Sequence, residues 1–228
     1  MENKIQFLSK YRKNISIVNM AKINEDTVSN EWYNILKESD RSFRIKNTID
    51  YWNSISSAEL RNTISYLTHN LVDVELINYE DTYSILYTVK VGDGEIDYFE
   101  GKMPIRSVNN TELNKFWTNT PISIKNFYEK LHNGFYYFPS RAMGLIPLED
   151  ITFFGDDEWG IIEELDSPLG IKLDSTFGFF STGMGGYVAL DYNNCGNDNA
   201  TVWFVDEQPQ YNADFWDIVD EWIVIGFE

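Results

Sequence analysis

Few side chains in this sequence have the type and spacing that catalysis requires. The chain contains two histidines, His69 and His132, and one cysteine, Cys195. His69 follows an apolar helical run, and His132 stands at an expected helix C-terminus, where a cation would complement the helix dipole. Cys195 has no nearby sequence partner that would activate a thiol, so a small buried or turn residue is the simpler interpretation. These residues predict no nucleophile–base pair.

Two short motifs resemble ligand-binding loops but fail on spacing. Gly183-Met184-Gly185-Gly186 lacks the pattern of a dinucleotide fingerprint and the Lys-Ser/Thr pair of a P-loop. A hairpin turn that needs positive φ explains these glycines better. Asp191–Gly196 begins like a calcium loop, but its twelfth position is Val202, where a bidentate Glu is required. We therefore predict that the protein is not an enzyme and has no catalytic residues, no metal and no cofactor.

The charge of the chain is strongly segregated. Its 228 residues include 18 Lys and Arg against 36 Asp and Glu, a formal net charge of −18. Residues 1–141 are nearly balanced at −1, whereas residues 142–228 carry −17, with Lys172 as their one basic residue. Such a balance argues against nucleic-acid or anionic-membrane binding, both of which need clustered Lys and Arg. A basic partner is the natural expectation.

Composition places the chain among globular proteins. Hydrophobic residues make up 43% of the sequence and aromatic residues 16%, enough to bury a sizeable core. No stretch approaches 18 uncharged apolar residues, and the start of the chain shows no apolar segment of the secretory type. We expect no membrane association and a cytoplasmic location.

The first eighty residues have mostly helical patterns. Ser29 or Asn30 could cap a short helix that carries Trp32 and Leu36. Apolar residues at helical spacing predict further helices over 43–55 and from Ser56 to Leu67. Alternation over 82–91, the turn Gly92-Asp93-Gly94 and the run 95–99 then predict a β-hairpin.

The second half alternates between helices and short strands. Thr120 and Pro121 would open a helix that runs to Leu131 and stops at Gly134. A helical turn is expected over 157–165. Strands are expected over Phe177–Ser181, Tyr187–Asp191 and Thr201–Val205. A closing helix, capped by Asn212, should pack Phe215, Ile218, Val219 and Trp222 on that sheet.

The order of these features from about Thr111 to Glu228 resembles the SUKH superfamily, the Knr-type proteins. The features that carry the resemblance are a Pro-initiated helix ending in Asn-Gly, a Leu-Ile-Pro-Leu turn, two strands joined by a Gly-rich turn, a third strand and a closing aromatic helix. In this sequence they are Pro121–Gly134, Leu145–Leu148, Phe179–Ser181, Gly186–Asp191, Val202–Asp206 and Phe215–Trp222.

This resemblance implies an α+β fold with a mixed, mainly antiparallel sheet flanked by helices. It divides the chain into an N-terminal helical and hairpin extension, residues 1–105, which could share the same globule, and a SUKH-like domain, residues 106–228. Bacterial members of the superfamily are chiefly immunity proteins that bind and neutralise polymorphic toxins, often nucleases. The family brings no catalytic residues, and Asn133, Gly134, Gly186 and Asp191 are best interpreted as turn and packing residues.

The acidic half offers a candidate surface for a cognate toxin, which we expect to be a basic, nuclease-type protein whose active face it would cover. The sequence Asp156-Asp157-Glu158-Trp159, followed by Glu163-Glu164, combines carboxylates with an aromatic anchor in an expected surface segment. Four further residues at strand ends could join the same face: Tyr192, Asp198, Asp206 and Glu207.

Two other functions remain open at this point. A carbohydrate- or peptide-binding regulatory module of the cell-wall-regulator type would also use exposed Trp and Tyr. It does not need a charge of −17 in one half of the chain. An unrecognised enzyme would depend on acidic pairs such as Glu163-Glu164, whose partners the sequence does not reveal.

Overall fold

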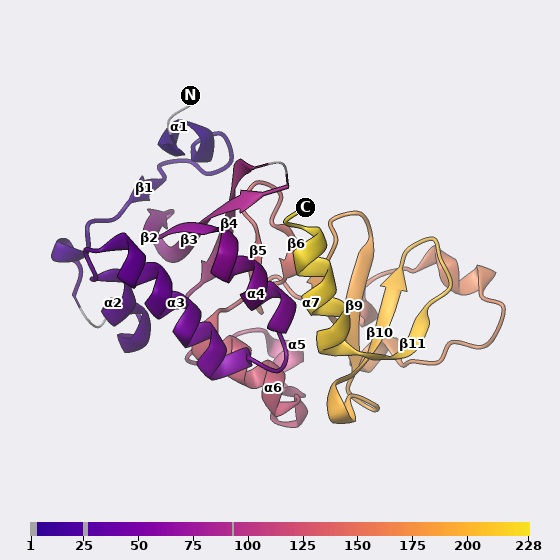
Figure 1. Cartoon of the computed structure of the whole chain (residues 1–228). Coiled ribbons are helices and arrows are strands. Elements are labelled where there is room, and N and C mark those ends of the chain that lie inside the picture. The colour runs from indigo at the N-terminus through magenta and orange to yellow at the C-terminus, as the bar shows by residue number, and fades with distance from the viewer. Residues whose placement is uncertain (1–3, 25–26, 93) are drawn as a thin grey trace.

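The structure is a computed structural model that describes residues 4–24, 27–92 and 94–228 (Figure 1). The elements of the first half are α1 (Lys4–Leu8), β1 (Ser16–Ile17), α2 (Asn30–Leu36), α3 (Arg41–Ser56), α4 (Arg61–Asn70), β2 (Leu71–Tyr79), β3 (Thr82–Val91) and β4 (Glu95–Lys102). Those of the second half are α5 (Thr111–Asn114), α6 (Ile122–Asn126) with a π-helical turn over Phe127–Leu131, β5 (Phe135–Tyr137), β6 (Ala142–Leu145), β7 (Thr152–Phe153), β8 (Thr176–Ser181), β9 (Gly186–Asp191), β10 (Asn199–Phe204), β11 (Gln210–Asp214) and α7 (Phe215–Ile225).

One antiparallel sheet runs through the molecule. Its strand order is β1-β2-β3-β4-β5-β6-β8-β9-β10-β11, and β7 also pairs with β8. The predicted α+β fold with a mainly antiparallel sheet is therefore confirmed. The hairpin of β3 and β4 and the adjacent strands β8, β9 and β10 form as the sequence predicts.

Strand β2 differs from the expectation that the first eighty residues are mostly helical. It follows α4 directly and pairs with β3 in register from Asp73–Thr88 to Tyr79–Thr82. Glu80 and Asp81 make the turn, both in the left-handed region with φ of 50° and 59°. The β-branched residues of this segment pair with a neighbouring strand, and that tertiary pairing overrides the local helical pattern.

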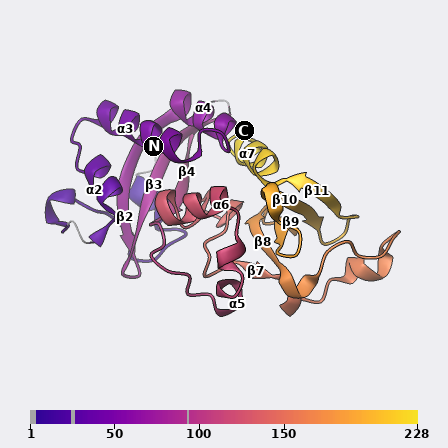
Figure 2. The same cartoon turned by 90° about the horizontal axis from the view of Figure 1, so that it is seen from below.

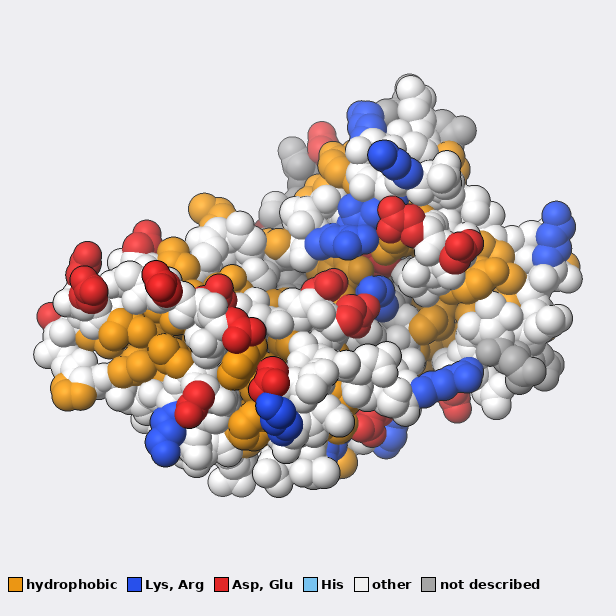
Figure 3. Space-filling model, turned by 180° about the vertical axis from the view of Figure 1, so that it is seen from behind, with side chains coloured by type: hydrophobic (Ala, Val, Ile, Leu, Met, Phe, Trp, Pro, Cys, Tyr) orange, Lys and Arg blue, Asp and Glu red, His pale blue; other side chains and the backbone are white. Residues whose placement is uncertain are grey.

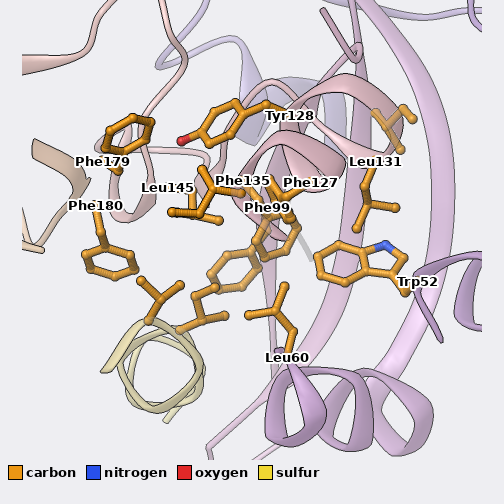
Figure 4. Close-up of a cluster of buried hydrophobic side chains, with 14 of the residues drawn as sticks. Trp52, Leu60, Phe99, Phe127, Tyr128, Leu131, Phe135, Leu145, Phe179 and Phe180 are labelled. Carbon is orange, nitrogen blue, oxygen red and sulfur yellow. The ribbon is translucent and has the colours of Figure 1, made fainter. Parts of the chain in front are cut away.

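One side of the sheet, here called the helical face, is covered by α2, α3, α4, α6 and α7 (Figure 2). Helix α2 begins where Ser29 accepts a hydrogen bond from the Trp32 N–H, as predicted. Asp40 caps α3 by accepting from the N–H groups of Ser42 and Phe43. The apolar sides of these helices meet the sheet in one core, in which the rings of Trp52, Phe127 and Phe135 are fully buried (Figure 4).

This core crosses the expected division near residue 105. Strand β4 pairs with β5, so the sheet is continuous across that position. Helix α4 packs on α7, and the buried Asp220 carboxylate of α7 accepts from the backbone N–H groups of Asn62 and Thr63, at 2.8 and 2.7 Å. Leu60, the N-cap residue of α4, makes no capping hydrogen bond itself, so Asp220 supplies the cap from the other end of the chain.

Two other helix starts differ from the prediction. Pro121, not Thr120, is the N-cap residue of α6, and the Thr120 hydroxyl instead forms a hydrogen bond with the Tyr192 hydroxyl at 2.7 Å. Asp214, not Asn212, caps α7, by accepting from the N–H groups of Trp216 and Asp217. Pro121 makes no side-chain capping hydrogen bond, because the contact with Tyr192 takes the Thr120 hydroxyl away from the start of α6. At α7 two capping residue types, Asn212 and Asp214, stand two positions apart, and the local structure selects the second.

The buried side of α7 is also rotated relative to the predicted stripe. Phe215 and Val219 are buried as expected, but Trp216, Asp220 and Ile223 complete the buried side. Trp222 is only half-buried, against the rings of Phe180 and Phe204. The helix packs on α4 as well as on the sheet, and this second contact shifts its buried face.

His132 is not the solvated cation that its position at a helix end predicts. The ring is fully buried, and burial lowers the pKa of His132 to about 3. Its Nδ1–H donates to the Lys102 carbonyl oxygen, and its Nε2 accepts from the Tyr87 hydroxyl at 2.6 Å. The Trp52 indole N–H in turn donates to the Tyr87 oxygen at 2.9 Å. Neutral His132 thus completes a chain of hydrogen bonds inside the core.

The other side of the sheet, here called the opposite face, has two separate covers. At one end, Leu8 and Ile15 of the N-terminal segment pack on Ile77, Leu86 and Tyr98. At the other end, residues 154–174 cross β9 and β10 and enclose a small core around Phe154 and Trp203. The middle of this face lies between the two covers.

Candidate protein-binding surface

The second cover, residues 154–174, is here called the acidic strap. It contains 3₁₀ turns over Phe154–Asp156 and Gly160–Glu164, the latter inside the predicted helical turn, and ends at a third over Leu173–Ser175. Its apolar side chains point inward, and Phe154 and Ile161 are buried against Ala189 and Trp203. The strap is thus anchored on the sheet by hydrophobic packing.

Trp159 is part of this anchor. Its indole N–H donates to the Phe154 carbonyl oxygen at 3.0 Å, and its ring centroid lies 4.5 Å from that of Phe154 and 5.2 Å from that of Trp203. The ring is partly buried, so much of Trp159 is committed to holding the strap in place. This differs from the exposed aromatic anchor that the sequence predicts.

Asp191 fastens the far end of the strap. Its carboxylate accepts from the Ser175 hydroxyl at 2.8 Å, the Asn193 N–H at 2.9 Å and the Lys172 N–H at 3.2 Å. Asp191 therefore acts as a turn and packing residue, as the sequence interpretation holds. Gly134, with φ of 88°, likewise occupies the left-handed position expected after a helix.

The outward side of the strap is acidic. Seven carboxylate residues of the strap are exposed: Asp156, Asp157, Glu158, Glu163, Glu164, Asp166 and Asp174. Within the residues that the structure describes, none of them forms an ion pair. Figure 3 shows acidic side chains surrounding hydrophobic ones at this end of the molecule, on the left in that view. Carboxylates without internal partners leave their field available to a basic protein.

The turn between β10 and β11 joins the same surface. Asp206 and Glu207 are exposed there, and the neighbouring Gln208 bridges to the strap. The Gln208 amide donates to the Glu164 carbonyl oxygen at 3.0 Å and accepts from the Asp166 N–H at 3.2 Å. The structure therefore brings Asp206 and Glu207 beside the strap residues named from the sequence.

Tyr192 and Asp198 lie elsewhere. The Tyr192 ring stacks on Phe116 with centroids 5.1 Å apart and belongs to the core of the helical face. Asp198 accepts a hydrogen bond from the Ser123 hydroxyl of α6 at 2.7 Å. Both residues belong to the segment between β9 and β10, which turns toward the helical face, whereas the strap covers the opposite one.

Sequence reasoning missed the residues that hold this surface together. Trp203 is fully buried beneath the strap, and Gln208 fixes the neighbouring turn. Asp166 and Asp174 extend the acidic surface beyond Glu164. The alternation of Val202, Trp203 and Phe204 was the available signal, because it places Trp203 on the face of the sheet away from Val202.

The comparisons with known proteins add no assignment. No family model, curated protein or solved structure matches the chain. The resemblance to the SUKH superfamily therefore stays a prediction. Over the described ranges, no helix is long and apolar enough to span a membrane. Nor does that part of the chain gather three or more His, Cys, Asp or Glu side chains as a possible metal site.

Proposed function

We propose that the protein is an immunity protein that binds a cognate, basic, nuclease-type polymorphic toxin through the acidic strap and covers its active face. The observation that carries this proposal is a braced surface whose exposed carboxylates form no ion pairs among the described residues. The order of motifs that resembles the SUKH superfamily supports the choice of a toxin as the partner.

Physical chemistry links such a surface to such a partner. A nuclease must present Lys and Arg to phosphates, so its active face is basic whatever its fold. Opposite fields raise association rates from about 10⁵–10⁶ to about 10⁸–10⁹ M⁻¹s⁻¹ at low salt, and an inhibitor that must act before cleavage gains from rapid capture. Specificity then comes from apolar contacts among the charges, which the partly exposed Ile162 and Leu165 can supply.

The test compares two charge-reversed variants that carry the same change in net charge. One is Asp156/Asp157/Glu158→Lys, in the strap. The control is Glu31/Asp50/Glu95→Lys, at exposed positions in the first half of the chain. Association with the toxin encoded beside the gene is followed by stopped-flow fluorescence at several salt concentrations, together with protection of cells that express the toxin.

We expect the strap variant to associate at least about tenfold more slowly at low salt, and the control to change much less. The wild-type rate should fall as salt rises. A rate that does not depend on salt, or a strap variant that protects cells as well as the wild type, would show that the strap is not the docking surface.

A second candidate function rests on a polar cavity beside the strap. It has a volume of about 160 Å³ and is lined by Asn194, Asn199, Tyr211 and Asn212, among others. Amide groups beside a tyrosine ring suit a carbohydrate hydroxyl group, in line with the carbohydrate-binding alternative. Binding to a glycan array that Asn199→Ala abolishes would favour this function over toxin binding.

A further inference from the structure

The middle of the opposite face contains a cavity that the proposed function does not use. Its volume is about 320 Å³, and it lies between the strap and the N-terminal cover. Residues that line it include Tyr136, Arg141, Pro147, Asp150, Thr152 and Tyr187. It is here called the central hollow. Figure 3 looks onto this face and shows basic and acidic side chains side by side near its middle.

Arg141 supplies the positive charge of the central hollow. Its backbone is in the left-handed region, with φ of 57°, and Met143 two residues later has φ of 48°. Left-handed backbone costs an arginine roughly 1 kcal/mol, which the surrounding structure must offset. The hairpin between β5 and β6 therefore holds Arg141 at an uncommon backbone conformation beside the cavity.

Arg141 is exposed, and an arginine guanidinium stays cationic without help from its neighbours. Burial alone would lower the pKa of Arg141, but Tyr79, Tyr136 and Glu100 raise it. Glu100 is fully buried; one carboxylate oxygen accepts from the Tyr79 hydroxyl, and the other has no hydrogen-bond partner among the described residues. Arg12, also buried, lies close enough to Tyr79 and Tyr136 to influence the pKa of both.

Arg12, Arg141 and Glu100 together carry one positive charge, and the exposed Asp150 carboxylate on the lining of the hollow balances it. The positive part faces the cavity through Arg141, because Arg12 donates to the Tyr11 and Phe138 carbonyl oxygens instead. One anionic group of a ligand can pair with the Arg141 guanidinium there.

Hydroxyl groups complete the polar part of the site. Three residues with hydroxyl groups line the central hollow: Tyr136, Thr152 and Tyr187. Burial raises the pKa of Tyr136 well above its ordinary value, so its hydroxyl stays protonated and can donate. The aromatic rings and Pro147 provide apolar walls.

We propose that the central hollow binds a small organic carboxylate whose charged group meets Arg141 and the hydroxyls of Tyr136 and Thr152, and whose apolar body packs against Pro147 and Tyr187. The exposed carboxylate of Asp150 on the lining opposes a second negative charge, so a monoanion is favoured over a phosphate dianion. A guanidinium fork matches the two oxygens of a carboxylate.

The experiment uses three probes of similar shape: benzoate, benzamide and phenyl phosphate. Binding to the full chain is measured by calorimetry and by NMR of the Tyr187 ring. The variants are Arg141→Gln and Thr152→Val in the hollow, with Arg61→Gln, an exposed arginine at the start of α4, as the matched control. Thermal unfolding checks that each variant is folded.

We expect benzoate to bind with a dissociation constant of about 1 mM or below. Benzamide should bind at least about tenfold more weakly, and Arg141→Gln should weaken benzoate by a similar factor. Thr152→Val should weaken it about threefold, and Arg61→Gln should change nothing. If Arg141→Gln fails to fold, Asp150→Asn gives an independent test, because it should strengthen phenyl phosphate relative to benzoate.

Four outcomes would overturn the proposal. One is no benzoate binding to the wild type at about 50 mM, well above the expected constant. Another is equal binding of benzoate and benzamide. The third is benzoate binding by Arg141→Gln that equals that of the wild type. The fourth is phenyl phosphate that binds more tightly than benzoate to the wild type. None of these measurements involves the toxin, so they leave the proposed function independently testable.

Discussion

The core of the helical face and the small core under the acidic strap differ in how much packing holds their tryptophans. In the first, the indole N–H groups of Trp32 and Trp52 both donate hydrogen bonds, to the Leu131 carbonyl oxygen and the Tyr87 hydroxyl. The Trp216 indole N–H of the same core and the Trp203 indole N–H under the strap are each buried without a partner among the described residues. A buried donor without a partner costs about 1–3 kcal/mol. Each core therefore carries one such cost, but the core of the helical face offsets it with packing from five helices, whereas the strap is held by few side chains and is bound more loosely.

The two regions also differ in whether their ionisable side chains have partners inside the protein. Buried ionisable side chains on the helical face are partnered, as His132 and Asp220 are. The carboxylates of the strap are exposed and form no ion pair within the described ranges. Polar groups that specify the fold and polar groups offered to a partner thus occupy opposite sides of one sheet. Changes to these groups should therefore alter the free energy of unfolding by very different amounts.

The largest effect concerns acid stability and His132. Its pKa of about 3 in the folded protein lies below the unfolded value near 6.5, so between these pH values the unfolded chain binds more protons. This group therefore makes the free energy of unfolding rise from pH 3 to pH 6.5, by up to roughly 5 kcal/mol, and contributes its full amount above 6.5. Denaturant unfolding at several pH values measures the slope.

The control for this prediction is His69→Gln, which removes an exposed histidine. Its pH slope should stay close to that of the wild type, whereas His132→Gln should lower stability and flatten the slope. NMR gives a direct reading of the His132 ring. Titration of its resonances between pH 8 and pH 5 would contradict the buried, neutral state.

The next effect concerns the link between the two ends of the chain. Asp220→Ala should lower the free energy of unfolding by about 2–3 kcal/mol, because it leaves the N–H groups of Asn62 and Thr63 without their charged acceptor. The control is Asp217→Ala, an exposed residue in the first turn of the same helix, which should cost less than about 1 kcal/mol. Equal losses for the two variants would show that Asp220 does not cap α4.

A smaller and more local effect is expected at the strap. Trp159→Ala should cost about 1–2 kcal/mol, because the ring is only partly buried, and should increase amide exchange mainly over residues 154–174. Trp52→Ala, fully buried in the core of the helical face, should cost about 3–5 kcal/mol and affect the whole molecule. Hydrogen exchange with mass spectrometry separates the two. Global exposure in Trp159→Ala would mean that the strap is not an independent unit.

Local chemistry was enough to predict much of the fold. The Ser29 cap, the β3–β4 hairpin and the strands β8, β9 and β10 depend on patterns within a few residues. Strand β2 was missed because its turn uses Glu80 and Asp81 in left-handed conformations instead of Asn-Gly. His132 was misinterpreted because its burial comes from α2, α3 and β3, which no pattern near residue 132 reveals.

The candidate protein-binding surface, too, could be predicted from the sequence only in part. Exposure of Asp156, Asp157 and Glu158 follows from composition alone. Which face a side chain occupies depends on the path of the chain across the sheet, and this decides that Trp159 packs under the strap while Tyr192 packs on the helical face. The spacing of residues in the sequence does not show how the chain crosses the sheet.

The smallest effect tests whether the strap carboxylates repel one another. Asp156→Asn with Asp157→Asn removes two exposed negative charges from a half of the chain with a balance of −17. Since neither carboxylate has an ion-pair partner in the described part of the chain, the loss should raise the free energy of unfolding by about 0.2–0.5 kcal/mol at low salt. Salt screens exposed charges over about 10 Å at 0.1 M, so the gain should vanish as salt is added. Denaturant unfolding at low and high salt measures it. A variant less stable than the wild type at low salt would mean that these carboxylates support the strap, and the contrast between a stable helical face and an uncommitted acidic surface would fail there.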